Sequence, residues 1–183
     1  MIQKFTLESH HDRLLLQGLL VLPEQKPPRA VFQVAHGMCE HKERYLPFLQ
    51  EMADHGYVCV IHDHRGHGGS VRQTEDLGYF YPDGGPALVS DLYQVTRWIR
   101  EQYPELPLYL FGHSMGSLAV TLLSETLSGC AGRRVCLRLS QRCFRAGTGR
   151  TCPGSAGKEK GRILPEQAAG GCCLFRIPET VPG

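Results

Sequence analysis

Residues 106–116 read Leu-Pro-Leu-Tyr-Leu-Phe-Gly-His-Ser-Met-Gly, an apolar run that passes directly into the pentapeptide G-H-S-M-G. We expect a buried strand over 108–111 and, after Ser114, a buried helix that begins near Ser117. A serine on a sharp strand-to-helix turn has strained backbone angles, and glycine fits beside it because it lacks a Cβ. The helix N-terminus directs free N–H groups and a positive dipole end at the same place. The stretch therefore predicts Ser114 as a nucleophile, with Gly112 and Gly116 supporting the turn.

Two further apolar runs end in loops rich in histidine and glycine. Residues 30–35 lead into His36-Gly37-Met38-Cys39-Glu40-His41, and residues 57–61 lead into His62-Asp63-His64-Arg65-Gly66-His67-Gly68-Gly69-Ser70. Both runs have the pattern of buried strands, so both loops are expected at strand ends.

Taken together and in this order, H-G-M-x-E-H-x-x-R-Y, D-x-R-G-H-G-x-S and G-H-S-M-G resemble the motifs of the monoacylglycerol lipase and lysophospholipase group of α/β-hydrolases, often catalogued as serine aminopeptidase-like hydrolases. The resemblance covers roughly residues 1–125. It implies a nucleophile elbow at Ser114 and an oxyanion hole made by the backbone N–H groups of Met38 and Met115. His36, Gly37 and His113 would support these loops, and the substrate would be a small acyl ester or a lipid-like molecule.

Strands and helices alternate along this part of the chain. We expect strands at 4–9 and 14–22 as an antiparallel pair, then strands at 30–35, 57–61 and 108–111, with helices at 45–54 and 86–103. Such alternation predicts an α/β fold with a mostly parallel sheet and helices on both faces. The fold class is therefore the N-terminal half of an α/β-hydrolase, followed by an irregular tail.

Length and composition set further bounds. The 183 residues form one domain that is short for this fold, since α/β domains commonly reach about 200–250 residues. No run of 18 or more apolar residues occurs, and residues 1–5 lack a signal-peptide pattern, so we expect a cytoplasmic protein with at most peripheral membrane contact. No metal-ligand cluster, phosphate loop or dinucleotide fingerprint is visible, so neither metal nor cofactor is expected.

Composition changes sharply near residue 125. Residues 126–183 contain six of the eight cysteines, eight arginines, two lysines and three glutamates, for a formal charge of +7. A zinc module lacks C-x-x-C pairs and histidines, a disulfide scaffold suits a secreted chain, and a nucleic-acid arm lacks clustered charge and stacking aromatics. A divergent or spliced segment is an alternative. We favour an irregular tail translated out of frame, because allowed codons for residues 135–142 and for those from 163 onward encode family-like segments after a one-nucleotide shift.

The residues after Ser114 offer no complete catalytic triad. In this fold the nucleophile is followed by an acid and then a histidine, but here only Glu125, Glu159, Glu166 and Glu179 follow, and all nine histidines lie at or before His113. Serine without a base is a poor nucleophile. We therefore expect an ester hydrolase that is inactive as written; a non-catalytic fragment, or a peptidase or amidase of the same fold, is the alternative.

The upstream polar residues have more ordinary interpretations than replacing the missing base. His36 is expected to hold its loop by hydrogen bonds, and His113 to pack against neighbouring loops. Asp63 and Arg65 suit a structural ion pair or cap better than substrate binding. Glu40 and His41 either shape the oxyanion loop or face solvent. The turn after the strand at 57–61 is expected to contain His62, His64 and His67. Cys39 and Cys59 are expected to be small buried fillers. The aromatic loop Tyr79–Tyr81 is expected to pack on the core.

Loss of the later strands predicts a stability problem. The strand before Ser114 would have one open edge, and apolar residues such as Leu108, Leu110 and Leu118 would lose their cover. Exposed strand edges and apolar patches favour aggregation. The chain is therefore expected to be insoluble or partly unfolded when it is expressed alone.

Overall fold

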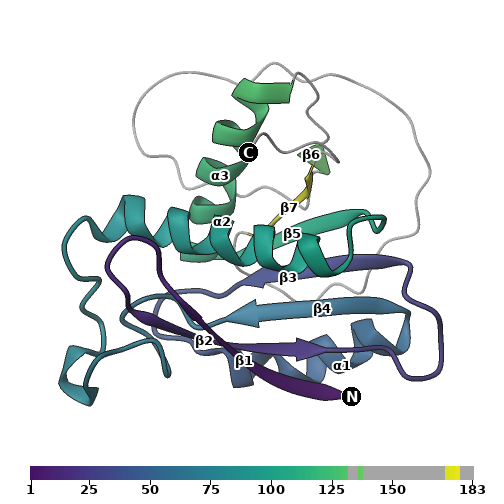
Figure 1. Cartoon of the computed structure of the whole chain (residues 1–183), viewed down its shortest axis with the longest axis horizontal. Helices are drawn as coiled ribbons and strands as arrows, with labels where there is room; N and C mark the ends of the chain where they lie inside the picture. The colour runs from purple at the N-terminus through teal and green to yellow at the C-terminus, as the bar shows by residue number, and fades with distance from the viewer. Residues whose placement is uncertain (132–135, 138–171, 178–183) are drawn as a thin grey trace.

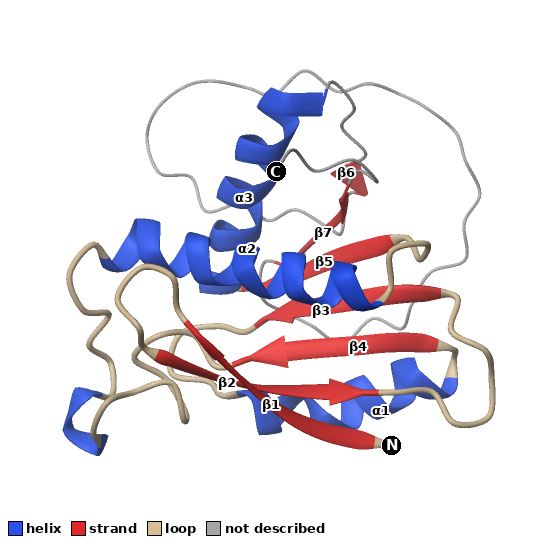
Figure 2. Cartoon of the chain, viewed as in Figure 1, coloured by secondary structure: helices blue, strands red, loops and turns tan. Residues whose placement is uncertain are grey.

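The structure, a computed structural model, describes residues 1–131, 136–137 and 172–177 (Figure 1). Within these residues the chain forms a seven-stranded sheet in the order β1-β2-β4-β3-β5-β7-β6, with helices on both faces (Figure 2). The strands are β1 (Ile2–Glu8), β2 (Leu15–Val21), β3 (Ala30–Ala35), β4 (Tyr57–His62), β5 (Leu108–His113), β6 (Cys136–Leu137) and β7 (Cys172–Ile177).

The centre of the sheet is the parallel α/β arrangement that the alternating pattern predicts. β3 pairs in parallel with β4 on one side and β5 on the other, with Val34 opposite Ile61 and Ala35 opposite Gly112. The strands outside this centre pair antiparallel: β1 with β2, β2 with β4, β5 with β7, and β6 with β7. Because β3, β4 and β5 end at the same edge, their following loops meet there, where open α/β sheets place their sites.

Helices cover the two faces of the sheet. α1 (Leu46–Asp54) packs on one face through Leu49, Met52 and Ala53. α2 (Gly84–Gln102) and α3 (Met115–Ala131) pack on the other, so α1 and α2 lie on opposite sides of the sheet (Figure 1). The strand residues alternate between the two cores, as a period of two requires. The helices expected at 45–54 and 86–103 are confirmed to within two residues at each end.

A buried polar link fixes α2 against the central strand. Gln33 on β3 is fully buried, and its side-chain amide donates a 3.1 Å hydrogen bond to the carbonyl of Leu92. Its side-chain oxygen accepts a 2.8 Å hydrogen bond from the Thr96 hydroxyl. A buried amide without partners would be costly, so these bonds specify the register of helix on sheet.

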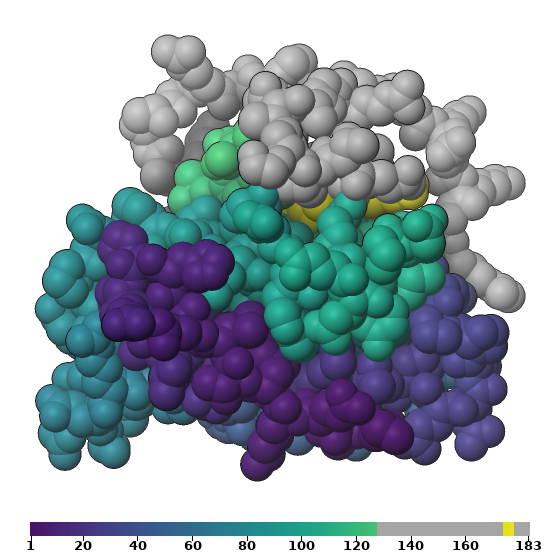
Figure 3. All heavy atoms as spheres, in the orientation of Figure 1, coloured from purple at the N-terminus to yellow at the C-terminus, as the bar shows by residue number. Residues whose placement is uncertain are grey.

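The β1–β2 hairpin packs over α2, where the purple and teal surfaces meet in Figure 3. The ring of Phe5 stacks on Trp98 with centroids 4.3 Å apart. Gln94 donates a 2.7 Å hydrogen bond to the carbonyl of Glu8 and accepts one of 3.0 Å from the N–H of His10. The hairpin therefore contributes to the cover of the helix as well as to the sheet.

Three segments of the expected tail have regular backbone: the end of α3, β6 and β7. α3 continues to Ala131, past the expected boundary at residue 125, and β7 pairs with β5 from Leu108 opposite Ile177 to His113 opposite Cys172. The expectation of an open edge at β5 is therefore wrong. Leu108 and Leu110 are buried, whereas Leu118 is 67% exposed, as expected. The remaining residues of the expected tail, 132–135, 138–171 and 178–183, lie outside the described residues.

Candidate active site

Ser114 lies on a strained turn between β5 and α3. Its φ is +52°, in the left-handed region that non-glycine residues rarely adopt. The turn brings neighbouring backbone very close: a Cβ on Gly116 would lie 2.6 Å from the carbonyl carbon of Ala35, and a Cβ on Gly112 would lie 2.7 Å from Cα of Ser117. Both positions therefore require glycine, and the strain at Ser114 is held by the close packing of β3, β5 and α3.

The loop after β3 lies against this turn. A Cβ on Gly37 would lie 3.2 Å from Cβ of Ser114 and 3.1 Å from Nδ1 of His113, so the loop and the turn at Ser114 are in contact. Met38 follows in this loop with half of its surface exposed, and Met115 is the first residue of α3. The structure thus places the residues expected to form an oxyanion hole on two segments that touch beside Ser114.

The carboxylate of Glu40 joins the loop to the turn. Its Oε2 accepts hydrogen bonds from the Gly37 N–H at 2.7 Å, the Tyr45 hydroxyl at 2.6 Å and Nδ1 of His113 at 3.1 Å. Burial raises the pKa of Glu40, but the hydrogen bonds from Tyr45, Gly37 and His113 outweigh burial and lower the pKa to about 2. Of the two interpretations of Glu40, the shaping of the oxyanion loop is the one that these contacts support, whereas His41 is half exposed and pairs with Glu43.

His36 makes the loop-holding hydrogen bonds expected of it. Its Nδ1 bonds the carbonyl of Gly37 at 2.8 Å, and its Nε2 accepts a 2.9 Å hydrogen bond from the N–H of His64. Both ring nitrogens are therefore engaged, which argues against a role as base. Nδ1 of His113 is likewise engaged, with Glu40.

Three further imidazoles surround His36. The ring of His64 lies 4.3 Å from that of His36, the ring of His67 lies 5.4 Å from it, and His62 lies 5.1 Å from His64. Burial lowers the pKa of His62 to about 3 and that of His64 well below the usual value. The rings of His62 and His64 are therefore neutral at physiological pH, and they pack as core groups rather than acting as proton donors.

The loop after β4 is organised by two separate ion pairs. The carboxylate of Asp63 lies 2.6 Å from Nζ of Lys42 and also accepts the N–H groups of Lys42 and Gly69, each at 2.7 Å. Arg65, which is fully buried, lies 2.8 Å from Asp91 and 3.3 Å from Asp12. As expected, Asp63 and Arg65 form structural ion pairs. They do not pair with each other: Asp63 pairs with Lys42, whereas Arg65 pairs with Asp91 and Asp12.

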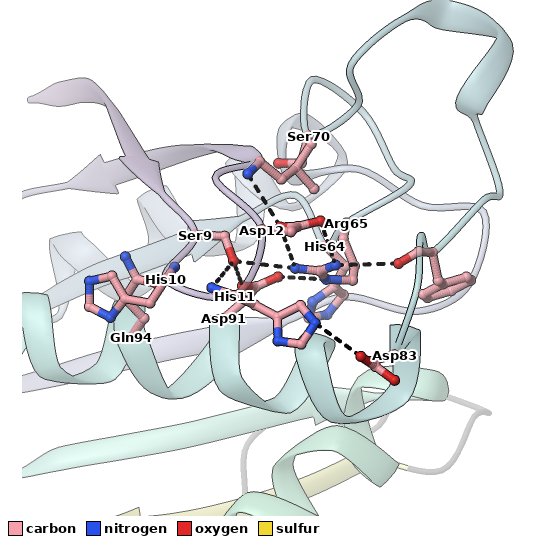
Figure 4. Close-up of polar contacts among 12 residues, drawn as sticks. Ser9, His10, His11, Asp12, His64, Arg65, Ser70, Asp83, Asp91 and Gln94 are labelled. Carbon is pink, nitrogen blue, oxygen red and sulfur yellow. Dashed lines mark hydrogen bonds and ion pairs between the residues drawn. The ribbon is translucent and has the colours of Figure 1, made fainter.

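Figure 4 shows Arg65 between the β1–β2 turn and α2. Its Nη2 also lies 3.3 Å from the hydroxyl of Ser9, and Ser9 in turn donates a 2.5 Å hydrogen bond to Asp91. Asp12, Asp91 and Lys42 were not singled out by sequence reasoning. For Asp91 a signal exists: it lies on the apolar face of α2, beside Leu88, Leu92 and Val95, where a lone carboxylate needs a buried partner.

The two upstream cysteines differ from each other. Cys59 is buried, and burial raises the pKa of its thiol to about 12, as suits an inert filler. Cys39 is exposed and has a φ of +57°, so the expectation that it is a buried filler is wrong. The reason is the tight turn from Gly37 to Glu40. This turn directs Cys39 outward and brings the N–H of Glu40 within 3.3 Å of the carbonyl oxygen of Gly37.

The aromatic loop 79–81 packs on the body through Phe80, whose ring lies 5.4 Å from that of His67, and through Tyr81. The Tyr81 hydroxyl accepts a 2.8 Å hydrogen bond from the Arg72 N–H and donates one of 2.9 Å to Asp76, whereas Tyr79 is 54% exposed. A hollow of about 350 Å³ lies elsewhere, between the hairpin and α2, lined by residues that include His10, Gln94 and Trp98. In the described part of the chain, no three His, Cys, Asp or Glu side chains are placed to hold a metal ion, and no helix is both long and apolar enough to cross a bilayer.

A strained serine between a central parallel strand and a helix, with a His-Gly loop packed against it, is the arrangement of an α/β-hydrolase fold. The family model described as serine aminopeptidase, S33, matches residues 26–132, which is more than half of the chain. The chain therefore belongs to this family, and its resemblance to the monoacylglycerol lipase group is confirmed.

Relatives of known type agree with this placement. The chain is 35% identical to a monoglyceride lipase of Rattus norvegicus over 97 residues, which cover 53% of this chain and 30% of that protein. It is 32% identical to a monoglyceride lipase of Homo sapiens over 106 residues, 57% of this chain and 33% of that protein. The chain thus spans about a third of the length of the curated relatives it matches.

Solved structures show the same fold. A thermostable carboxyl esterase from Bacillus coagulans, in complex with glycerol, superposes with a TM-score of 0.64 at 30% identity, over 72% of this chain and 41% of that one. A monoglyceride lipase from Saccharomyces cerevisiae superposes with a TM-score of 0.51 at 19% identity, over 64% of this chain and 35% of the other, which bears on the fold alone.

Proposed function

We propose that this chain carries the nucleophile and oxyanion-hole part of a serine ester hydrolase of the monoacylglycerol lipase or lysophospholipase type. The observation that carries the proposal is the strained turn at Ser114, packed against the Gly37–Met38 loop. The similarity to monoglyceride lipases and to a carboxyl esterase supports an acyl ester, such as a monoacylglycerol, as the substrate class.

In this reaction each residue has a defined task. Oγ of Ser114 attacks the ester carbonyl carbon, and the backbone N–H groups of Met38 and Met115 stabilise the negative charge that develops on the carbonyl oxygen. The bond from the carbonyl carbon to the alkoxy oxygen breaks, and the alcohol leaves with a proton that water carries from Oγ. A water molecule then adds to the acyl carbon, the carboxylic acid leaves, and Oγ regains a proton. Glycine at 37, 112 and 116 lets the three backbone segments approach each other closely enough for this arrangement.

We further propose that the 183 residues as written turn over esters at close to background rate. Ser114 has no histidine after it in the sequence, and both ring nitrogens of His36 are already hydrogen-bonded. An oxyanion hole and binding alone retain roughly 10³–10⁴-fold acceleration over water.

The test is hydrolysis of a short p-nitrophenyl ester by the purified chain and by its Ser114→Ala variant. We expect a slow release of p-nitrophenolate at similar rates in both proteins, because the residual acceleration comes from the oxyanion hole and binding and not from the serine. Robust turnover abolished by Ser114→Ala would overturn the proposed inactivity and support the nucleophile. A rate no faster than that of buffer alone would overturn the oxyanion hole and favour a non-catalytic fragment.

We propose that the cysteine- and arginine-rich segment is translated in a shifted frame. The family match runs to residue 132, so we place the shift after that residue rather than at residue 125. Sequencing the encoding DNA across codons 120–140 and translating all three frames tests this. Family-like sequence in a second frame supports the shift, and its absence from both other frames overturns it.

A further inference from the structure

Glu40 makes contacts to both halves of the expected oxyanion hole. One of its oxygens, Oε2, accepts the N–H of Gly37 on the loop before Met38 and also bonds Nδ1 of His113, the residue before Ser114. The same oxygen accepts the Tyr45 hydroxyl, and Oε1 lies 3.4 Å from Nε of Arg44. The side chain of Glu40 is only 10% exposed, so solvent competes little for these bonds.

We propose that Glu40 is a positioning residue that sets the distance and orientation of the Met38 loop relative to the nucleophile turn. This inference rests on the proposed function, because it concerns the backbone N–H groups of Met38 and Met115 that would stabilise the oxyanion in that reaction. Glu40 itself does not touch the reacting atoms; it acts through Gly37 on one side and His113 on the other.

The geometry supports a clamp rather than an ordinary surface carboxylate. A Cβ on Gly37 would lie 2.9 Å from Oε2 of Glu40, so a side chain at residue 37 would displace the carboxylate from its present position against the loop backbone. Cys39 takes a φ of +57° in the turn that returns Glu40 to the loop, where the N–H of Glu40 donates a 3.3 Å hydrogen bond to the carbonyl of Gly37. Cys39 is therefore strained in the turn that brings the Glu40 carboxylate to the N–H of Gly37.

Charge explains why a carboxylate occupies this position. Three donors converge on one oxygen, and hydrogen bonds to an ionised acceptor are about twice as strong as neutral ones. Glutamine could accept from Gly37 and Tyr45 through its oxygen, but without the charge. Alanine would leave the Gly37 N–H without this partner and would disconnect His113 from the loop.

The first experiment follows backbone amides by NMR in the full ¹⁵N-labelled chain and in Glu40→Gln, Glu40→Ala, His113→Ala and Tyr45→Phe. Glu51→Ala, which removes an exposed carboxylate on α1, is the matched control. We expect Glu40→Ala to move the Gly37, Met38 and Met115 amides together, Glu40→Gln to move them less, and Tyr45→Phe to move chiefly the loop. In the wild type the Gly37 amide should report no titration of Glu40 between pH 7.5 and 4.5, because its hydrogen bonds lower the pKa of Glu40 to about 2.

The second experiment measures reaction of Ser114 with diethyl p-nitrophenyl phosphate. The serine oxygen forms a bond to phosphorus, p-nitrophenolate leaves, and the serine proton passes to water; the phosphoryl oxygen takes the place of the oxyanion. We expect the labelling rate, followed by mass spectrometry, to fall 10- to 100-fold in Glu40→Ala and less in Glu40→Gln, since misplacing a donor by about 1 Å costs on this order. Glu51→Ala should match the wild type.

The two experiments separate the inference from the proposed function. If Gly37 moves in Glu40→Ala while Met115 does not, or if neither moves, the clamp is overturned whatever Ser114 does. If the wild type takes up no diethylphosphoryl group at Ser114 even after prolonged incubation with excess reagent, the assignment of Ser114 as the nucleophile fails, and the amide shifts still decide the role of Glu40. Should Glu40→Ala not fold, Glu40→Gln and His113→Ala give the same comparison, and unchanged amides in both would overturn the inference.

Discussion

The backbone N–H of His64 donates a 2.9 Å hydrogen bond to Nε2 of His36, and this bond ties the chain after β4 to the end of β3. Because Nε2 accepts, the proton of the neutral ring lies on Nδ1, which donates to the carbonyl of Gly37. Protonation of His36 would remove the acceptor and break the tie. Burial lowers the pKa of His36, which keeps the ring in its accepting form.

The buried imidazoles predict acid sensitivity. The pKa values of His62 and His64 are lower in the folded chain than the usual 6.5, to about 3 for His62, because burial disfavours the charged ring. Below pH 6.5 the unfolded chain therefore binds more protons than the folded one, and stability falls as the pH is lowered from about 6.5 toward 3. Each such ring should contribute a slope of about 1.4 kcal/mol per pH unit in that window. Urea unfolding at a series of pH values from 4.5 to 7.5 measures the slope.

His62→Phe is the informative variant for this slope. Neither ring nitrogen of His62 has a hydrogen-bond partner in the described part of the chain, so an apolar ring of similar shape should be tolerated at pH 7.5. The variant should lose stability less steeply than the wild type on acidification. His55→Ala, at an exposed position, serves as the control. An unchanged slope in His62→Phe would count against the buried-histidine explanation.

Removal of the Arg65 guanidinium should strongly destabilise the fold. Arg65→Met leaves Asp91 with a buried charge and without its 2.8 Å partner, and breaking a buried ion pair in this way typically costs about 3–5 kcal/mol. Chemical denaturation measures the loss. Arg97→Met, which breaks an exposed 4.0 Å pair with Glu101, is the matched control and should have little effect.

The double variant Arg65→Met with Asp91→Leu distinguishes charge from packing. Replacing both partners by apolar side chains removes the unpaired charge, so we expect a substantial part of the stability to return. A double variant no more stable than Arg65→Met alone would show that Arg65 acts through its contacts with Ser9 and Asp12 instead.

Gly116 should tolerate no side chain. In Gly116→Ala the new Cβ would lie 2.6 Å from both the carbonyl carbon of Ala35 and the carbonyl oxygen of His36, so backbone must move, at a cost of about 1–3 kcal/mol or more. Gly85→Ala is the matched control in the first turn of α2, where a Cβ meets nothing within 4 Å. That control should be neutral or stabilising by up to about 1 kcal/mol. Thermal melting compares the two, and equal melting temperatures would contradict the close approach.

The exposed apolar residues of α3 should promote self-association. Leu118 and Leu122 are one helical turn apart and are 67% and 53% exposed. The double variant Leu118→Gln with Leu122→Gln should lower light scattering at a given concentration with little change in melting temperature. Leu123→Ala, at a position 2% exposed on the same helix, should instead destabilise by about 2–5 kcal/mol. Undiminished scattering from the double variant would place the aggregating surface elsewhere.

Features carried by short stretches of sequence were predictable. The strands and helices up to α3 follow from apolar spacing, and the turn at Ser114 follows from two glycines and a serine between a strand and a helix. The exposure of Cys39 was not predictable, because it depends on the turn that brings the Glu40 carboxylate to the N–H of Gly37. The pairing of β7 with β5 was likewise missed, since no local pattern says which distant segment covers a strand edge.

By itself, the sequence determined the fold class and the position of Ser114 on a turn between a strand and a helix, because each depends on residue types at fixed local spacing. Only the tertiary structure decided the polar partners. Arg65 reaches Asp12, 53 residues away, and Asp91, 26 residues away, and Glu40 reaches His113, 73 residues away. Such contacts depend on which loops the sheet brings to one edge, and a buried charge takes whichever partner that arrangement places within hydrogen-bond distance.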